Sequence, residues 1–214
     1  MSAATFDYSK DKENMVAERY RKEQTFTREE GIKKCRRKKL AVECYAGQGT
    51  LTAIYKSQFD TVIDNDINIK SPALHHMSAM LFIEEVVHEL HKKEKLDLID
   101  LDCYGSPAYE IQHFFKCAKY HTPFVLCLSD GLGMWLKRTK NEQSLRRRYL
   151  IPNSVPIDWQ KIWERHPQLI DAFIKQLCDN HGLKGYLICS KQTKNKNYVL
   201  ASYKITKPRE KADA

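Results

Sequence analysis

The chain has 214 residues, of which 42% are hydrophobic and 29% are charged, and its formal net charge is +9. This composition excludes a disordered chain, and a chain of this length buries roughly 70% of the surface that its unfolded form exposes, enough for one sizeable core. No apolar run reaches the ~20 residues that span a bilayer, and the first residues lack the apolar segment of a secretory signal, so we expect neither membrane insertion nor secretion.

Helical and strand patterns alternate along most of the chain. The expected helices cover residues 11–38, 50–57, 72–93, 107–119 and 167–182. The expected strands begin with the apolar run at Leu40 and continue at residues 61–63, 96–101, 123–128, 185–190 and 198–205. Gly31 is expected to interrupt the first helix, Pro72 to open the third, and residues 131–158 to be irregular. The alternation predicts an α/β fold: a mostly parallel sheet with helices on both faces and a C-terminal antiparallel hairpin.

The domain organisation expected from these patterns is simple. Residues 1–38 form a basic N-terminal helical extension, residues 39–207 a single domain, and residues 208–214 a polar tail. The seven cysteines are odd in number and contain no C-x-x-C motif. We therefore expect neither a disulfide framework nor a zinc site, and a reducing cytoplasm is the natural compartment. The histidine spacings also predict no metal site.

The positive charge is clustered. The three clusters are Lys33, Lys34, Arg36, Arg37, Lys38 and Lys39; Lys137, Arg138, Lys140, Arg146, Arg147 and Arg148; and Lys191, Lys194 and Lys196. Clustered Lys and Arg on a small domain are the electrostatic footprint of a polyanion-binding protein. We therefore predict nucleic acid as the partner and no membrane; a solvated charged face is the alternative reading. The oligomeric state is not indicated.

Two strand ends carry residues suited to a small ligand. The first strand ends in Glu43 and the glycine-rich run ECYAGQGT (residues 43–50), which is neither G-x-G-x-x-G nor a P-loop. An acid there would repel phosphate and suit a cationic ligand. Asp66 ends the second strand, and an acid about 20 residues downstream can hold both ribose hydroxyls, with Ile67 on an adenine face. Ordinary turn and capping roles are the alternative.

A third strand end is the most specific segment of the chain. The run LIDLDCYGSP (residues 98–107) delivers an acid, an aromatic residue and a tight turn to the same edge of the sheet. Turn formation explains Gly105, Ser106 and Pro107, but it does not explain Asp102 and Tyr104 beside them.

These motifs resemble those of a known enzyme class. ECYAGQG followed by Asp66 is similar to the cofactor motifs of class I S-adenosylmethionine-dependent methyltransferases. LIDLDCYGSP resembles the catalytic motif D-P-F/Y-G-S-P of the tRNA (guanine-N2-)-dimethyltransferase family, and Ser129-Asp130 resembles the next strand end of that family. The resemblance implies a Rossmann-like sheet and a cytoplasmic transferase that takes part in tRNA processing. It implies that S-adenosyl-L-methionine is the cofactor and that the substrate is an exocyclic base amine, with RNA preferred over DNA.

The resemblance also implies roles for individual residues. Asp102, Cys103 and Tyr104 would be catalytic: the Asp102 carboxylate and the Cys103 carbonyl would accept the amine hydrogens, and Tyr104 would stack on an extruded base. Cofactor contacts would come from Glu43, Tyr45, Ala46, Gly47, Gly49, Thr50, Asp66, Ile67 and Asp102. Substrate contacts would come from Gly105, Ser106, Pro107, Ser129, Asp130, Arg146, Arg147 and Arg148.

The chain departs from the family pattern at Cys103 and in the middle of the sheet. Cys103 stands where the family has proline. Only one helix fits between Asp66 and the strand of Asp102, so we expect the sheet to be shortened in its middle and to lack a third-strand acid for the adenine. Other readings are a DNA amino-methyltransferase acting on adenine or cytosine, a pyrimidine methyltransferase with Cys103 as the nucleophile, a small-molecule methyltransferase, and a non-catalytic nucleic-acid-binding module.

Overall fold

The computed structural model describes residues 8–90, 93, 95–132, 141–159, 161–162 and 164–208, with side chains from residue 17 onward. Six strands form one sheet in the order β2-β1-β3-β4-β6-β5. They are β1 (Leu40–Glu43), β2 (Thr61–Asp64), β3 (Leu98–Asp102), β4 (Phe124–Asp130), β5 (Lys184–Gln192) and β6 (Val199–Thr206). β1 to β4 pair in parallel, and β6 pairs antiparallel with β4 and β5. This arrangement confirms the predicted α/β fold, a mostly parallel sheet with an antiparallel C-terminal hairpin.

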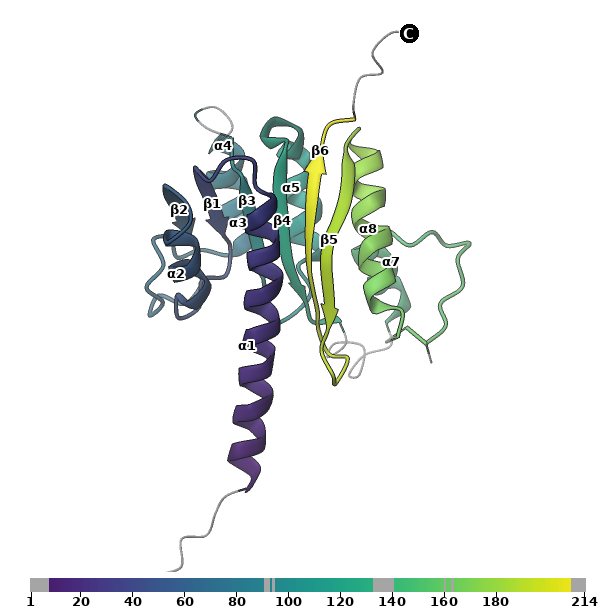
Figure 1. Ribbon diagram of the computed structural model, residues 1–214. Helices are drawn as coiled ribbons and strands as arrows, with labels where there is room; N and C mark the ends of the chain where they lie inside the picture. The colour runs from purple at the N-terminus through teal and green to yellow at the C-terminus, as the bar shows by residue number, and fades with distance from the viewer. Residues whose placement is uncertain are drawn as a thin grey trace, which may run out of the picture.

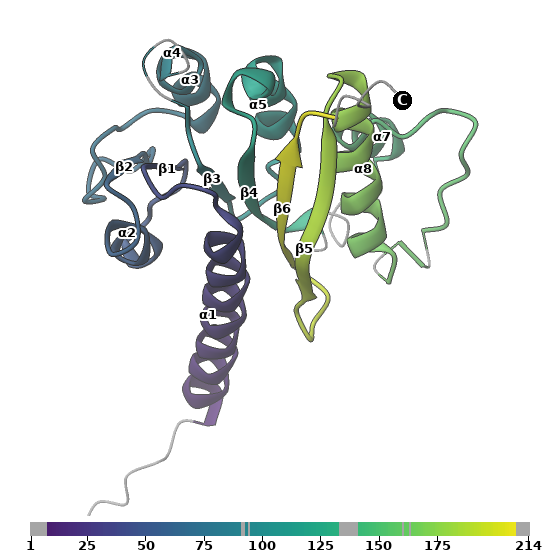
Figure 2. The same cartoon turned by 45° about the horizontal axis from the view of Figure 1, so that its top comes forward.

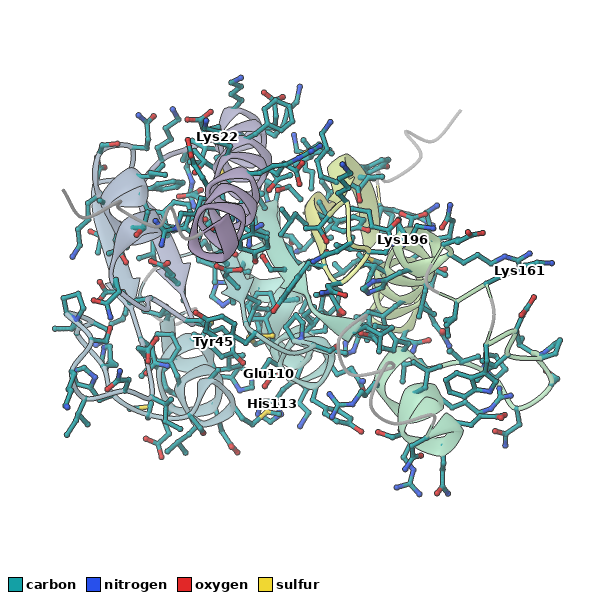
Figure 3. All side chains as sticks on the ribbon, turned by 90° about the horizontal axis from the view of Figure 1, so that it is seen from below. Lys22, Tyr45, Glu110, His113, Lys161 and Lys196 are labelled. Atoms are coloured by element: carbon teal, nitrogen blue, oxygen red, sulfur yellow. The ribbon has the colours of Figure 1, made fainter. Side chains whose placement is uncertain are left out.

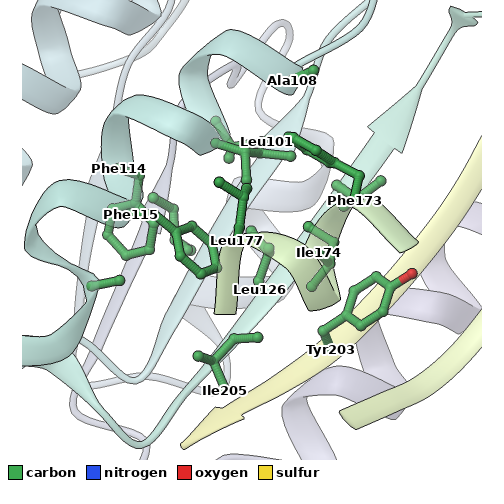
Figure 4. Close-up of a cluster of buried hydrophobic side chains, with 14 of the residues drawn as sticks. Leu101, Ala108, Phe114, Phe115, Leu126, Phe173, Ile174, Leu177, Tyr203 and Ile205 are labelled. Carbon is green, nitrogen blue, oxygen red and sulfur yellow. The ribbon is translucent and has the colours of Figure 1, made fainter. Parts of the chain in front are cut away.

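Helices cover both faces of the sheet (Figures 1 and 2). One face carries α1 (Tyr8–Lys34) and α2 (Thr50–Lys56). The other face carries α3 (Ala79–Phe82), the π-helical segment η1 (Ile83–Val87), α4 (His88–Leu90), α5 (Ala108–His121), α7 (Glu142–Tyr149) and α8 (His166–Asn180). The main core lies on this second face, where aromatic and aliphatic side chains of α5 and α8 pack on β3, β4 and β6 (Figure 4).

The sheet is shortened at its β2 edge and not in its middle as expected, because β2 is the edge strand and β1 pairs directly with β3. No strand lies beyond β2 in the described part of the chain; the segment that follows β2 makes a single backbone bridge, from Asn65 to His75. The expected helix from Pro72 is wrong: the helix begins at Ala79, after Ser78 caps it. Leu74, His75 and Met77 instead donate their N–H groups to Asp64 and Asn65. Those bonds hold the segment extended beside β2, which explains why Pro72 opens no helix.

Two other expectations are corrected. Gly31 does not interrupt the first helix, because α1 continues through it to Lys34. Helix α7 lies inside the segment that was expected to be irregular. Its sequence has no apolar stripe over several turns, and only Leu145 and Tyr149 are buried in it. Asn141 caps this helix by accepting the Ser144 N–H at 2.9 Å. A capping residue of this kind is the sequence feature that could have indicated where the helix begins.

Helix α1 is longer than the strands it covers. Its 27 residues span about 40 Å, whereas the five residues of β3 span about 16 Å. Its sheet-facing stripe begins at Gln24 and continues through Thr27, Arg28, Gly31 and Ile32, all buried. The preceding turns therefore project past the edge of the sheet at which β1 to β4 end (Figure 1). The domain boundary near residue 38 stays a prediction.

Candidate active site

The carboxyl ends of β1 and β2 are joined by direct contacts. The Asp66 carboxylate accepts the N–H of Gly47 at 2.8 Å, and the N–H of Ala46 donates to the carbonyl of Asn65 at 2.8 Å. Gly47 and Gly49 have φ angles of 54° and 79°, in the left-handed region that favours glycine. The predicted cofactor segment and the acid that follows β2 therefore form one cluster of loops.

Glu43 is a buried acid at the end of β1. Its Oε2 accepts the Thr52 hydroxyl of α2 at 2.5 Å. Burial raises the pKa of Glu43 from 4.5 to about 8; the Thr52 bond opposes this shift, and the charges of Asp100 and Asp102 add to it. The ionised form therefore lacks a compensating charge, and a cation bound here would stabilise it.

A cavity of about 230 Å³ lies beside this cluster, between the ends of β1 and β2 and the helices of the second face. Its lining consists of Cys44, Tyr45, Asn65, Ile67, Ser78, Ala79, Met80 and Glu110. Two of the predicted cofactor residues, Tyr45 and Ile67, are among them. The Tyr45 hydroxyl donates to Glu110 Oε1 of α5 at 3.1 Å, and both side chains are labelled in Figure 3.

Asp102, at the end of β3, is held by three side chains of helix α1. The Gln24 amide donates to Oδ2, the Tyr20 hydroxyl donates to Oδ1 at 3.5 Å, and Arg28 Nη2 lies 3.7 Å from Oδ1. The Asp102 side chain is 16% exposed. Burial raises the pKa of Asp102 above its ordinary 3.8, although Arg28 opposes the shift. The predicted catalytic acid is therefore a partly open carboxylate that N–H and O–H donors already surround.

Arg28 holds this arrangement from the interior of the protein. Its guanidinium is fully buried and binds the buried Asp100 carboxylate with two hydrogen bonds, of 3.1 and 2.8 Å. It also donates to the Leu128 carbonyl at 3.2 Å and to Ser129 Oγ at 3.0 Å. Tyr55 of α2 donates to Asp100 at 2.5 Å. The Arg28 guanidinium thus links α1 to β3 and β4 next to Asp102.

The loop after Asp102 is held in shape by neighbouring elements. The Gly131 N–H donates to the Gly105 carbonyl at 2.6 Å, and a Cβ at Gly131 would lie 2.7 Å from the Tyr104 carbonyl oxygen. The Tyr198 hydroxyl of the β5–β6 hairpin donates to the Tyr104 carbonyl at 3.3 Å. Tyr20 and Tyr198 pack edge to face at 5.3 Å. Tyr104 itself is 90% exposed, so its ring projects into solvent two residues after the acid.

Ser129 and Asp130, two of the predicted substrate residues, lie in the interior. Asp130 is 1% exposed, and its carboxylate accepts the hydroxyls of Ser106 and Tyr149 at 2.9 and 2.7 Å. It also contacts His166 Nε2 at 3.0 Å. Asp130 therefore acts on the loop through Ser106, and any part it has in substrate binding is indirect.

The thiol of Cys103 is poorly suited to attack a ring carbon. Its Sγ donates to the Ser129 carbonyl at 3.9 Å, and burial raises the pKa of the thiol well above its ordinary 9.0. A reactive cysteine needs its thiolate near neutral pH. This geometry disfavours the reading in which Cys103 is a nucleophile.

The basic clusters are distributed over different parts of the molecule. Residues 33–39 lie between the end of α1 and the start of β1, at the sheet edge opposite to Asp102. Lys191, Lys194 and Lys196 belong to the β5–β6 hairpin, whose turn lies on the Asp102 side (Figure 1). Lys137, Arg138 and Lys140 lie outside the described residues. The first and third clusters thus lie at opposite ends of the strands and do not form one continuous surface.

The arginines of α7 differ in their surroundings. Arg146 forms an ion pair with Glu142 at 2.6 Å. The guanidinium of Arg148 lies 4.8 Å from the centre of the Tyr109 ring. Arg147 is exposed, so it is the member of this predicted substrate set most accessible to a polyanion.

The sequence reasoning missed the residues that α1 and the hairpin contribute. Tyr20, Gln24, Arg28 and Tyr198 surround Asp102 but carry no motif. The one available signal was spacing, because Tyr20, Gln24 and Arg28 recur every four residues on one helical face. A polar stripe of this kind is invisible to a search for apolar periodicity.

Three further observations concern the described part of the chain. No group of three or more His, Cys, Asp or Glu side chains there could hold a metal ion. None of its helices combines the length and apolar character needed to traverse a bilayer. A more open hollow of about 440 Å³, lined in part by Lys119, His181 and Lys207, lies at the ends of α5, α8 and β6. This hollow lies at the opposite ends of the strands from Asp102, so we do not include it in the candidate site.

Comparisons with known proteins give similarities of shape. No protein-family model matches the chain, and no curated protein matches it. Among solved structures, the plantazolicin methyltransferase BamL, in complex with a triazolic desmethylPZN analog and SAH, has a TM-score of 0.47 at 12% identity, over 92% of this chain and 91% of that chain. Mtq2–Trm112 of E. cuniculi gives 0.47 at 12%, over 87% and 96%. Trm5b from Pyrococcus abyssi gives 0.42 at 14%, over 82% and 46%. These scores lie below 0.5 and record distant similarity.

Proposed function

We propose that this protein uses S-adenosyl-L-methionine to methylate an exocyclic amine of a nucleic-acid base, with guanine in RNA, such as tRNA, as the preferred target. One observation supports this most directly. The Asp102 carboxylate accepts an N–H from the planar amide of Gln24, and Tyr104, two residues further along, is exposed. An exocyclic base amine is likewise a planar, conjugated NH₂ group. It would bind where the Gln24 amide now lies.

The residues at the ends of β1 and β2 fit the proposed cofactor. Its ammonium group would supply the positive charge that the buried Glu43 lacks. Asp66 would accept the ribose hydroxyls, and its contact with Gly47 keeps the carboxylate at the glycine turn. The cavity beside Ile67 is smaller than the roughly 300–1,000 Å³ of a drug-sized site, and it suits one flat base. When bound, the cofactor supplies an electrophilic methyl group on a sulfonium centre.

The chain's own residues would then make the amine reactive. A base amine is a poor nucleophile because its lone pair is delocalised into the ring. The Asp102 carboxylate and the Cys103 carbonyl would each accept one N–H hydrogen bond from the amine, turning the lone pair towards the methyl group. As the amine nitrogen takes the methyl group, the electron pair of the broken C–S bond would stay on sulfur, and the Asp102 carboxylate would accept the proton that the amine releases. Tyr104 would stack on the base. Such positioning can supply several kcal/mol. Gln24 and Tyr20 would release Asp102 as the amine binds.

The surroundings of Asp102 suit a polyanionic substrate. Arg19, Arg21 and Lys22 are exposed on the projecting half of α1, and Lys194 and Lys196 are exposed on the hairpin. Figure 3 looks at this edge and labels Lys22 and Lys196 on the two separate elements. Cations on both sides of a catalytic acid can bind phosphates on either side of one extruded base.

The experiment that tests the proposal is labelled-methyl transfer to total RNA and to genomic DNA, with nucleoside mass spectrometry of the product. Methylated guanosine in RNA, lost in the Asp102→Ala variant, supports it. Methylated adenine or cytosine in DNA would keep the chemistry and change the substrate. If neither transfer nor cofactor binding is detected, the non-catalytic binding module is the better account.

A further inference from the structure

The cavity between β1, β2 and α5 contains a carboxylate oxygen that has no donor. Glu110 Oε1 accepts the Tyr45 hydroxyl, but Glu110 Oε2 is buried and has no hydrogen-bond partner among the described residues. A buried carboxylate oxygen without a donor is destabilising, so structures rarely keep one without a reason. The observation points to a ligand that donates a hydrogen bond here.

The other polar side chains that line the cavity are already in use. Asn65 donates its amide to the carbonyls of Cys44 and Met77 and accepts the Met77 N–H. Ser78 accepts the Leu81 N–H as the cap of α3. Among the described lining side chains, Glu110 is therefore the one with a buried polar atom that has no hydrogen-bond partner.

The remaining lining is apolar and suits a flat ring. Ile67 lies directly after Asp66, and Ala79 and Met80 begin α3 on the other side of the cavity. A ligand held by Asp66 through a ribose would extend its base past Ile67 into this space. A flat apolar surface combined with one acceptor selects a base that carries an N–H donor, as 6-aminopurine does.

The position of β2 as an edge strand explains why the acceptor comes from α5 and not from a further strand. β2 is the edge strand of the described sheet, and the segment from Ile67 to Ser78 supplies no acid to the cavity. On the basis of the proposed cofactor, we propose that Glu110 reads the adenine of S-adenosyl-L-methionine by accepting its exocyclic N–H. Tyr45 is a positioning residue that orients the Glu110 carboxylate. Glu110 of α5 would thus take the place of an acid from a strand beyond β2.

Calorimetric binding of SAH and of its 6-deamino purine analogue tests this without any turnover. The wild-type protein should bind SAH roughly 10- to 100-fold more tightly than the analogue, the range for one hydrogen bond to a charged acceptor. In Glu110→Ala the preference for SAH should fall to about twofold or less, because the effects of two independent changes add to within about that factor. Glu110→Gln keeps a carbonyl acceptor and should retain part of the preference. Tyr45→Phe removes the donor that orients the Glu110 carboxylate, so it should reduce the preference by less than Glu110→Ala does.

Glu85→Ala, an exposed acid of η1, is the matched control and should behave as the wild type. Thermal unfolding of each variant separates a lost contact from a lost fold. If Glu110→Ala stays folded and keeps the wild-type preference for SAH, the role of Glu110 is overturned while the proposed function stands. If the wild-type protein binds neither compound, both are overturned.

Discussion

Replacement of Arg28 by methionine is expected to destabilise the protein strongly. Arg28 is fully buried and makes four hydrogen bonds to Asp100, Leu128 and Ser129. Burial disfavours the charged guanidinium, but Asp100 and Asp102 reverse this and hold the pKa of Arg28 above its ordinary value. Methionine fills similar space but removes the charge. Among the described residues, the Tyr55 hydroxyl would then be the remaining donor to the buried Asp100 carboxylate.

The magnitude follows from the uncompensated charge. Removing one partner of a buried ion pair costs about 3–5 kcal/mol, because the other charge stays buried. The free energy of unfolding of a typical domain is about 5–15 kcal/mol, so the loss is a large part of the total. The double variant Arg28→Met/Asp100→Asn removes both charges and keeps an oxygen for Tyr55. It should recover about 1–3 kcal/mol relative to Arg28→Met alone.

Urea unfolding followed by far-ultraviolet circular dichroism measures these differences. The matched control is Arg21→Met, on the exposed face of the same helix, which should change the free energy of unfolding by less than about 0.5 kcal/mol. The reasoning would be refuted if Arg28→Met behaved like Arg21→Met. It would also be refuted if the double variant lost the sum of the two single effects, since the charges would then not be coupled.

Three further predictions concern the site. The pKa of Glu43 is raised to about 8, so between about pH 4.5 and 8 the folded protein keeps a proton that the unfolded chain has released. The free energy of unfolding of the ligand-free protein should therefore fall as pH rises through this window, and urea titrations of Glu43→Gln should show a flatter profile; equal slopes would contradict the assignment. Gly131→Ala places a Cβ 2.7 Å from the Tyr104 carbonyl, so it should cost about 1–3 kcal/mol in thermal unfolding and reduce methyl transfer more than SAH affinity. Unchanged turnover would show that the loop tolerates the shift. Cys103→Ala should keep most transfer, because the buried thiol has a raised pKa, whereas Asp102→Ala should lose it; complete loss in Cys103→Ala would favour covalent chemistry.

Local sequence patterns determined most of the sheet and the placement of the three strand ends. The apolar runs before Glu43, Asp66 and Asp102 read as strands, and glycines or a Gly-Ser-Pro turn marked where they end. These signals are local, since strand propensity and turn chemistry depend on neighbouring residues. Parallel pairing then brought the three ends to one edge, as a right-handed alternation of strands and helices requires.

Tertiary structure alone decided what surrounds those residues. The helix expected from Pro72 was prevented by hydrogen bonds to Asp64 and Asn65, partners that no local pattern specifies. Gln24 reaches Asp102 across 78 residues because α1 docks with its polar stripe against β3 and β4. Helical periodicity indicates which residues share a face, but not which face meets the sheet. The length of the projecting half of α1, and the buried donors beneath Asp102, follow from that docking.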